Sequence, residues 1–284
     1  MQFGASTFIW TSPFSNETLS LIDHAKALGF DILEICIEDP DTIDPLRIRS
    51  RLQQAGLQAT VCGAFGPSRD LRADDGEIRE NGMAYLSRCV EIAETLGSRT
   101  VVGPMYSAVG KTRMLEAPER AKQWRLAVES LRQAADFAAD HGVTLGIEPL
   151  NRFETDLVNT VDQGLRMIGD IDRPNVGLLL DTFHMNIEEK DIPAALHRAG
   201  GHIVEFHACS SDRGTPGEDH LPWPEIVGAL RDVDYHGPVV IEAFTPKIKE
   251  IARAVSIWRP LAESEDALAS NGLRHLKAAF AKGA

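Results

Sequence analysis

The sequence has few basic residues and lacks a long apolar run. Lys and Arg number 29, whereas Asp and Glu number 42, which gives a formal net charge of −13. Nucleic-acid-binding proteins usually carry a basic patch and anionic membranes attract basic surfaces, so neither is an expected partner. No apolar stretch approaches the roughly 20 residues of a membrane-spanning helix. The composition, with 43% hydrophobic residues, is that of an ordinary globular protein.

Cysteine is also scarce. The four cysteines are Cys36, Cys62, Cys89 and Cys209, and no two of them form a C-x-x-C pair. A chain of 284 residues can bury a core without disulfide bonds, so free thiols in a reducing compartment are expected. The first residues show no basic segment followed by an apolar one, as a secretory signal would. These absences predict a cytoplasmic protein.

One pattern recurs along the chain: an amphipathic stretch, then a glycine, then a short β-branched run. A helix that closes on glycine and leads into a buried strand gives this pattern. The glycines are Gly29, Gly56, Gly97, Gly142, Gly200 and Gly237. Two further strands are predicted over 3–7 and 176–180. The total is eight strands, and 284/8 leaves about 35 residues for each unit of strand, helix and loops.

The segments between these strands have apolar residues at helical spacing, for example over 83–93 and 124–138. Strands that alternate with helices are typical of a parallel sheet. Eight such units predict an α/β fold, a closed (β/α)8 TIM barrel that forms a single domain over 1–284. A further C-terminal helix is predicted over 264–281. The alternative, a doubly wound open sheet, usually has a glycine-rich turn after its first strand, and none is present here.

Four consecutive predicted strands end on a residue that can bind a metal ion. These residues are Glu148, Asp181, His207 and Glu242. In a TIM barrel the carboxyl ends of the strands form the active site, and adjacent strands lie about 4.8 Å apart. Three carboxylates and one imidazole suit a hard or borderline divalent cation. The pattern predicts one such ion per subunit, with Mn²⁺ expected and Co²⁺ or Mg²⁺ as alternatives.

Polar residues in the loops after these strands are candidates for binding a substrate. They are Glu154, His184 and Arg213, and Trp10 and Cys62 are candidates for the pocket wall. Each has a plainer interpretation: Glu154 as a helix-start carboxylate, His184 as a packed histidine and Arg213 as a surface ion pair. Cys62 could equally be a small core residue, since buried cysteines usually are.

The residues around the predicted ligands resemble a known family, the ketose 3-epimerases among the xylose isomerase-like barrels. The resemblance is carried by the segments 148–154 (EPLNRFE), 181–189 (DTFHMNIEE) and 216–223 (PGEDHLPW). It runs from the first strand to about residue 259. It implies that Glu148, Asp181, His207 and Glu242 bind the metal, and that Glu148 and Glu242 also act as the acid and base. It further implies that Glu154, His184 and Arg213 hold the sugar, and that the protein is a homodimer or homotetramer.

The sequence departs from that family at three loops, one of which is Gly103-Pro104-Met105-Tyr106. The family has Gly-Glu after the strand-7 histidine, where this chain has Ala208-Cys209-Ser210. The family has Glu-Pro-Phe at strand 8, where this chain has Glu242-Ala243-Phe244. Phe244 is a further candidate substrate contact. The metal ligands survive these changes, whereas the identity of the sugar is left open because such loops line the pocket.

The resulting hypothesis is a metal-dependent epimerase of free ketoses at C3, acting through a cis-enediolate. D-tagatose, D-fructose, D-allulose and L-ribulose are the expected kinds of substrate. Alternatives on the same site are an aldose–ketose isomerase, a hydroxypyruvate-type isomerase, or a 2-epimerase of a 3-keto sugar. A phosphodiesterase of the apurinic-endonuclease type would need more metal ligands and a basic face. A non-catalytic sugar-binding barrel would not need the complete ligand set.

Overall fold

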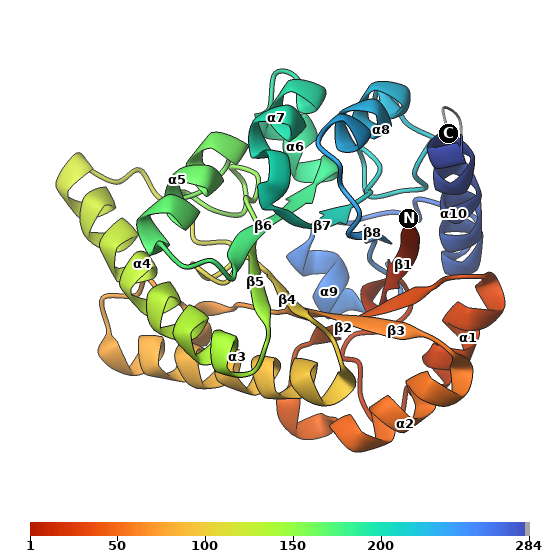
Figure 1. Cartoon of the computed structure of the whole chain (residues 1–284), viewed down its shortest axis with the longest axis horizontal. Helices are drawn as coiled ribbons and strands as arrows, with labels where there is room; N and C mark the ends of the chain where they lie inside the picture. The colour runs from red at the N-terminus through yellow and green to blue at the C-terminus, as the bar shows by residue number, and fades with distance from the viewer. Residues whose placement is uncertain (282–284) are drawn as a thin grey trace.

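The computed structural model describes residues 1–281, which contain eight strands in one closed barrel (Figure 1). Each strand pairs in parallel with the next in the chain, and the first pairs with the last. They are β1 (Gln2–Ser6), β2 (Ile32–Ile37), β3 (Gln58–Gly63), β4 (Thr100–Gly103), β5 (Thr144–Ile147), β6 (Val176–Asp181), β7 (Ile203–His207) and β8 (Pro238–Ile241). The predicted TIM barrel is confirmed.

Helices connect the strands and surround them in Figure 1. They are α1 (Ser20–Leu28), α2 (Pro45–Ala55), α3 (Gly76–Leu96), α4 (Ala117–Asp140), α5 (Val161–Ile171), α6 (Thr182–Glu188), α7 (Ile192–Ala199), α8 (Trp223–Asp232), α9 (Lys249–Ala254) and α10 (Glu265–Ala281). Short 3-10 helices are η1 (Thr7–Ile9), η2 (Pro40–Thr42), η3 (Pro67–Arg69) and η4 (Gly200–His202). The helices α6 and α9 lie in the loops after β6 and β8.

Glycine ends several helices as the sequence pattern predicts. Gly29 and Gly97 follow α1 and α3 with φ of 93° and 77°, a left-handed conformation that costs glycine little. The prediction is wrong at Gly237. Helix α8 ends at Asp232, and Asp234 adopts the left-handed conformation with φ 56°. Aspartate tolerates this region because its short polar side chain can hydrogen-bond locally, so no glycine was needed there.

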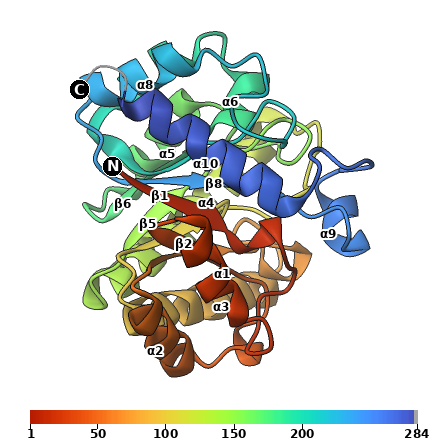
Figure 2. The ribbon, with the colours of Figure 1, turned by 90° about the vertical axis from the view of Figure 1, so that its right-hand side faces the viewer.

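The C-terminal helix is present and closes the ring of helices. Figure 2 shows α10 running across β1 and β8, with α8 on one side and α1 on the other. The Oγ atom of Ser264 accepts a hydrogen bond from the backbone N–H of Ala267, at 3.0 Å, and so caps the start of the helix. Leu268, Leu273 and Leu276 form its buried face. The helix therefore completes the outer layer after β8.

The barrel strands are covered on both sides. Every residue of β2 and β6 is buried, as expected for parallel strands with side chains inside the barrel and helices outside. Among residues 1–281, no helix combines the length and the hydropathy needed to cross a membrane. Parallel pairing leaves the carboxyl ends of all eight strands at one mouth of the barrel, which is where the candidate site lies.

Candidate active site

The structure brings the four predicted ligands to the barrel mouth. Asp181 and His207 are the last residues of β6 and β7, while Glu148 and Glu242 directly follow β5 and β8. Each has an exposed fraction of 6% or less. Single donor atoms of Asp181, His207, Cys209 and Glu242 all lie within 4.8 Å of one another. Donor atoms of Glu148, Asp181 and His184 form a second group of three within the same distance, and Asp181 belongs to both groups.

The ring of His207 is fixed by a carboxylate from the opposite half of the barrel. Its Nε2 atom donates to Oε2 of Glu34 at 2.8 Å, and both side chains are fully buried. Its Nδ1 atom lies 3.6 Å from Oε2 of Glu242 and 3.9 Å from Oδ2 of Asp181. In the part of the chain that the structure describes, this Nδ1 atom is buried without a hydrogen-bond partner.

This arrangement fits a divalent cation. A buried polar atom normally has a partner, and an unpartnered imidazole nitrogen that faces carboxylates is the donor a metal ion would take up. A metal-bound histidine commonly gives its other ring N–H to a carboxylate, as His207 does to Glu34. The nearby oxygens of Asp181 and Glu242 supply the hard ligands that Mn²⁺, Mg²⁺ and Co²⁺ accept.

Arg213 reaches into the centre of the site. Its Nη1 atom donates to Oδ2 of Asp181 and to Oε2 of Glu242, each at 2.7 Å. Its guanidinium lies over the rings of Phe183 and Phe244, 4.2 and 5.1 Å from their centroids. The backbone of Arg213 is left-handed, with φ 66°, a conformation that costs a non-glycine residue about 1–3 kcal/mol. The buried ion pairs offset that strain and hold the guanidinium over the carboxylates.

The three carboxylates differ in charge state. Burial raises the pKa of Glu148 well above its ordinary value, and the charge of Glu242 adds to this rise. Burial also acts to raise the pKa of Asp181, but Arg213 outweighs it and leaves that pKa low. The pKa of Glu242 is lowered for the same reason, against its burial. Charge clustering of this kind is typical of functional sites.

A hydrogen-bonded chain leads from the site to the loop after β5. The backbone N–H of Asn151 donates to Nδ1 of His184 at 3.1 Å. The Nε2 atom of the same ring lies 3.5 Å from Oε1 of Glu148 and 3.1 Å from Nη2 of Arg213. The Asn151 amide donates to Oε1 of Glu154 at 2.8 Å. Glu154, His184 and Arg213 are therefore brought together as the sequence predicts.

Comparison with known proteins identifies the family. A sequence model of the xylose isomerase-like TIM barrel family matches residues 22–279. A protein of Synechocystis sp., named as a probable ketose 3-epimerase, is 36% identical over 99% of this chain and 97% of its own length. A D-psicose 3-epimerase of Agrobacterium fabrum is 33% identical over 94% of this chain and 93% of its own length. The chain belongs to the ketose 3-epimerases of this barrel family.

Solved structures agree with this assignment. A structure of L-ribulose 3-epimerase superposes with a TM-score of 0.93 at 30% identity, over 99% of this chain and 94% of that one. A structure of D-psicose 3-epimerase in the presence of D-fructose gives a TM-score of 0.92 at 31% identity, over 99% of each chain. As a member of this family, the chain is an enzyme of the isomerase class, a carbohydrate epimerase.

The sequence did not reveal one residue that supports the site. Glu34 is buried in β2, and its signal was a carboxylate inside the otherwise apolar segment Ile32–Ile37. Asn151 belongs to the polar segment 148–154 and joins His184 to Glu154. Below His207, Glu205 points into the same buried layer. Burial, with the charge of Glu34 added, raises the pKa of Glu205 to about 8, which keeps it neutral.

The structure places the candidate pocket-wall residues in two different regions. Phe244 stacks under Arg213, and Cys62 packs in the same small apolar cluster as Phe244, together with Phe8 and Cys36. Trp10 lies elsewhere: its indole N–H donates to Asp266 at 2.8 Å, and it lines a surface groove between α1 and the start of α10. Phe244 and Cys62 remain candidate substrate contacts, whereas none of these contacts joins Trp10 to the four ligands.

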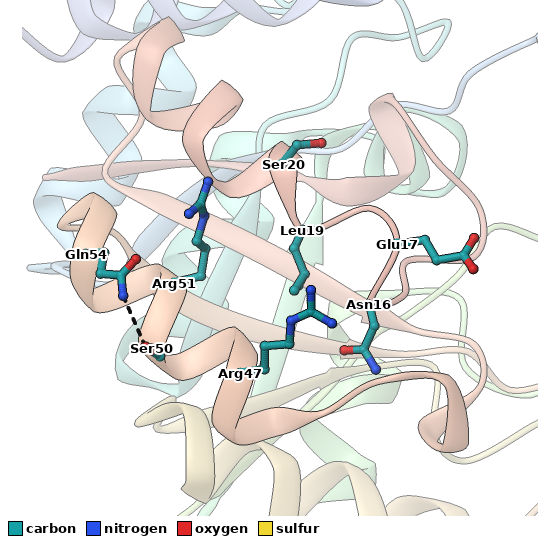
Figure 3. Close-up of a pocket in the computed structure, with 8 residues that line it drawn as sticks. All are labelled: Asn16, Glu17, Leu19, Ser20, Arg47, Ser50, Arg51 and Gln54. Carbon is teal, nitrogen blue, oxygen red and sulfur yellow. Dashed lines mark hydrogen bonds between the residues drawn. The ribbon is translucent and has the colours of Figure 1, made fainter.

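The surface also carries a hollow of about 550 Å³ away from these residues (Figure 3). It lies between α2 and the loop that leads into α1, and Arg47, Arg51 and Asn16 line it. Arg51 is already paired with Asp23 of α1. Because no predicted ligand or substrate contact lines this hollow, the chemistry is assigned to the barrel mouth instead.

Proposed function

We propose that this enzyme epimerises a free ketose at C3, by removing the C3 proton to give an enediolate and returning a proton to the opposite face. The observation that carries the proposal is the cluster of donor atoms of Asp181, His207 and Glu242, which shares Asp181 with a second cluster of Glu148 and His184. The likeness to ketose 3-epimerases over nearly the whole chain supports the same conclusion.

Glu148, Asp181, His207 and Glu242 would hold one divalent cation, with Mn²⁺ expected and Co²⁺ or Mg²⁺ as alternatives. When bound, such a cation supplies Lewis-acid polarisation of the ketose carbonyl, which makes the neighbouring C3 proton acidic enough for a carboxylate to remove. The buried surroundings strengthen every charge interaction at this point, because the local dielectric is low.

Glu148 and Glu242 are the proposed acid and base. They follow β5 and β8, which are separated in the barrel by β6 and β7, so their side chains enter the site from different directions. Epimerisation needs a base on one face of C3 and an acid on the other. A carboxylate removes the proton on its side, and the opposite carboxylic acid delivers one. The reverse reaction exchanges the two roles.

Three residues are proposed to orient the sugar. The imidazole of His184 and the guanidinium of Arg213 can hydrogen-bond to sugar oxygens, and the Glu154 carboxylate can accept from a hydroxyl. Among the described residues, Arg213 is the one Lys or Arg side chain within 4 Å of the site carboxylates, and two of them already neutralise it. A phosphate group would lack a free cation here, which favours an unphosphorylated ketose.

The carbon atom at which the enzyme exchanges a proton tests the proposal. The purified enzyme is incubated in D₂O with Mn²⁺, with and without EDTA, and offered D-fructose, D-tagatose, D-allulose and L-ribulose. NMR then locates the deuterium. Metal-dependent label at C3, with appearance of the C3 epimer, is expected. Label at C1 with an aldose product would make the enzyme an isomerase, and no label in any sugar would reject this substrate class.

The acid and base are tested by Glu148→Gln and Glu242→Gln. Each substitution keeps the size of the side chain but removes its ability to exchange a proton, so each is expected to abolish turnover. Circular dichroism and the thermal midpoint report whether the fold is intact. Near-normal activity in either folded variant would contradict the assignment of two bases. The cytoplasmic location and the homodimer or homotetramer stay predictions from the sequence.

A further inference from the structure

A thiol lies among the candidate metal ligands. Cys209 follows His207 by two residues and is fully buried. Its Sγ atom donates to Oδ2 of Asp181 at 3.1 Å and lies 3.2 Å from Nη1 of Arg213. Thr182 fixes the backbone here, because its Oγ1 accepts from the Cys209 N–H at 2.8 Å and donates to the Cys209 carbonyl at 2.5 Å. The sulfur is therefore held toward the site.

The surroundings of this thiol differ from those of a cysteine that merely fills the core. A core cysteine packs against apolar side chains. Cys209 instead contacts a carboxylate and a guanidinium, and it belongs to the group of donor atoms within 4.8 Å of one another. The unpartnered Nδ1 atom of His207 faces the same group. A coordination shell with metal–ligand distances of about 2.0–2.3 Å spans a similar width.

We propose that Cys209 is a sulfur ligand of the divalent cation at this site. The inference rests on the proposed function, since it requires the metal. Binding exchanges the S–H bond for a metal–sulfur bond, and the released proton goes to solvent, as is usual for a coordinating thiol. Sulfur is a soft ligand, so it favours Co²⁺, Zn²⁺ and Cd²⁺ over Mg²⁺.

Absorption spectroscopy with Co²⁺ tests the proposal. The full-length protein is freed of metal with a chelator, dialysed and titrated with CoCl₂. A sulfur-to-cobalt charge-transfer band is expected in the near ultraviolet, rising together with the visible cobalt bands to one equivalent. Cys209→Ser should keep the visible bands and lose the charge-transfer band. Its affinity for Cd²⁺ should fall by about tenfold or more, the loss that removal of an outer-sphere partner already causes.

Cys36→Ser is the matched control. Cys36 and Cys62 form a second thiol group with Glu34, whose donor atoms also lie within 4.8 Å of one another. If the sulfur band came from that group, Cys36→Ser would reduce it and Cys209→Ser would not, which would overturn the proposal. An unchanged band in Cys36→Ser together with its loss in Cys209→Ser supports it.

The spectrum of the unmodified protein tests whether a sulfur atom binds the cobalt ion, before any variant is made. Visible cobalt bands without a charge-transfer band would overturn the role of Cys209 and leave the metal site standing. No cobalt binding at all would overturn both, because the proposed function itself requires a divalent cation here.

Discussion

Replacing Glu34 by Gln removes one negative charge from beneath His207 and leaves the side chain almost the same size. In the parent protein the charged carboxylate accepts the Nε2–H of His207 at 2.8 Å, with both groups fully buried. The Gln side chain still offers an oxygen to the ring but no charge. A hydrogen bond to a charged group contributes about 1.5–3 kcal/mol, against about 0.5–1.5 kcal/mol for a neutral one.

The midpoints of these ranges differ by about 1.3 kcal/mol, which corresponds to a nearly tenfold change in an equilibrium constant. The Glu34 charge makes the imidazole a better donor to a cation, so Glu34→Gln is expected to raise the Kd for Mn²⁺ about tenfold. Losses of about 10–100-fold are usual when such outer partners are changed. Isothermal titration of Mn²⁺ into chelator-treated protein measures this directly.

Glu205→Gln is the control in the same buried layer. The pKa of Glu205 is raised to about 8, so at neutral pH this substitution replaces one uncharged side chain by another. Its Kd for Mn²⁺ should stay close to that of the parent. An unchanged Kd for Mn²⁺ in folded Glu34→Gln would refute the reasoning that the Glu34 charge acts through the His207 ring. An equal loss of Mn²⁺ affinity in both variants would refute it as well.

Four further predictions concern stability. Gly177→Ala should lower the free energy of unfolding by about 1–3 kcal/mol in urea denaturation, because a Cβ there would lie 2.4 Å from Cγ2 of Val204. Gly169→Ala, in the open interior of α5, should instead raise it by up to about 1 kcal/mol. Arg72→Met should cost about 1.5–3 kcal/mol in the same assay, because it removes the buried Arg72–Asp156 ion pair while Arg113 still pairs with Asp156. An excess of Mn²⁺ at about 100 times its Kd should stabilise the protein by about 2.7 kcal/mol, and an unchanged thermal midpoint would contradict the metal site.

The residues at the strand ends were predictable because each stands directly beside an apolar run in the sequence. Glu148 and Glu242 directly follow short apolar runs, and Asp181 and His207 close two others. Once eight such runs imply a barrel, parallel topology alone places their last residues at one mouth. The same logic predicted that Arg213 belongs to the site, since its loop follows β7.

Contacts between distant segments could not be predicted in this way. The hydrogen bond from His207 to Glu34 joins residues 173 positions apart, and it exists only because the barrel interior brings β2 and β7 face to face. Trp10 follows β1, as a pocket residue would, but its indole turns to Asp266 at the start of α10. Where a side chain points after a strand depends on which helix packs beside it, and local sequence does not carry that information.

The pairing of β1 with β8 has a consequence for how the protein is made. Gln2–Ala5 pair with Pro238–Ile241, so β1 has only β2 as a neighbour until nearly all of the barrel has been synthesised. An unpaired strand edge is prone to associate with other chains during that interval. Glu242 leaves the ribosome directly behind β8, so the fourth ligand arrives as the barrel becomes able to close. Closure of the strand barrel and completion of the candidate ligand set therefore coincide, before α10 adds the last helix of the outer layer.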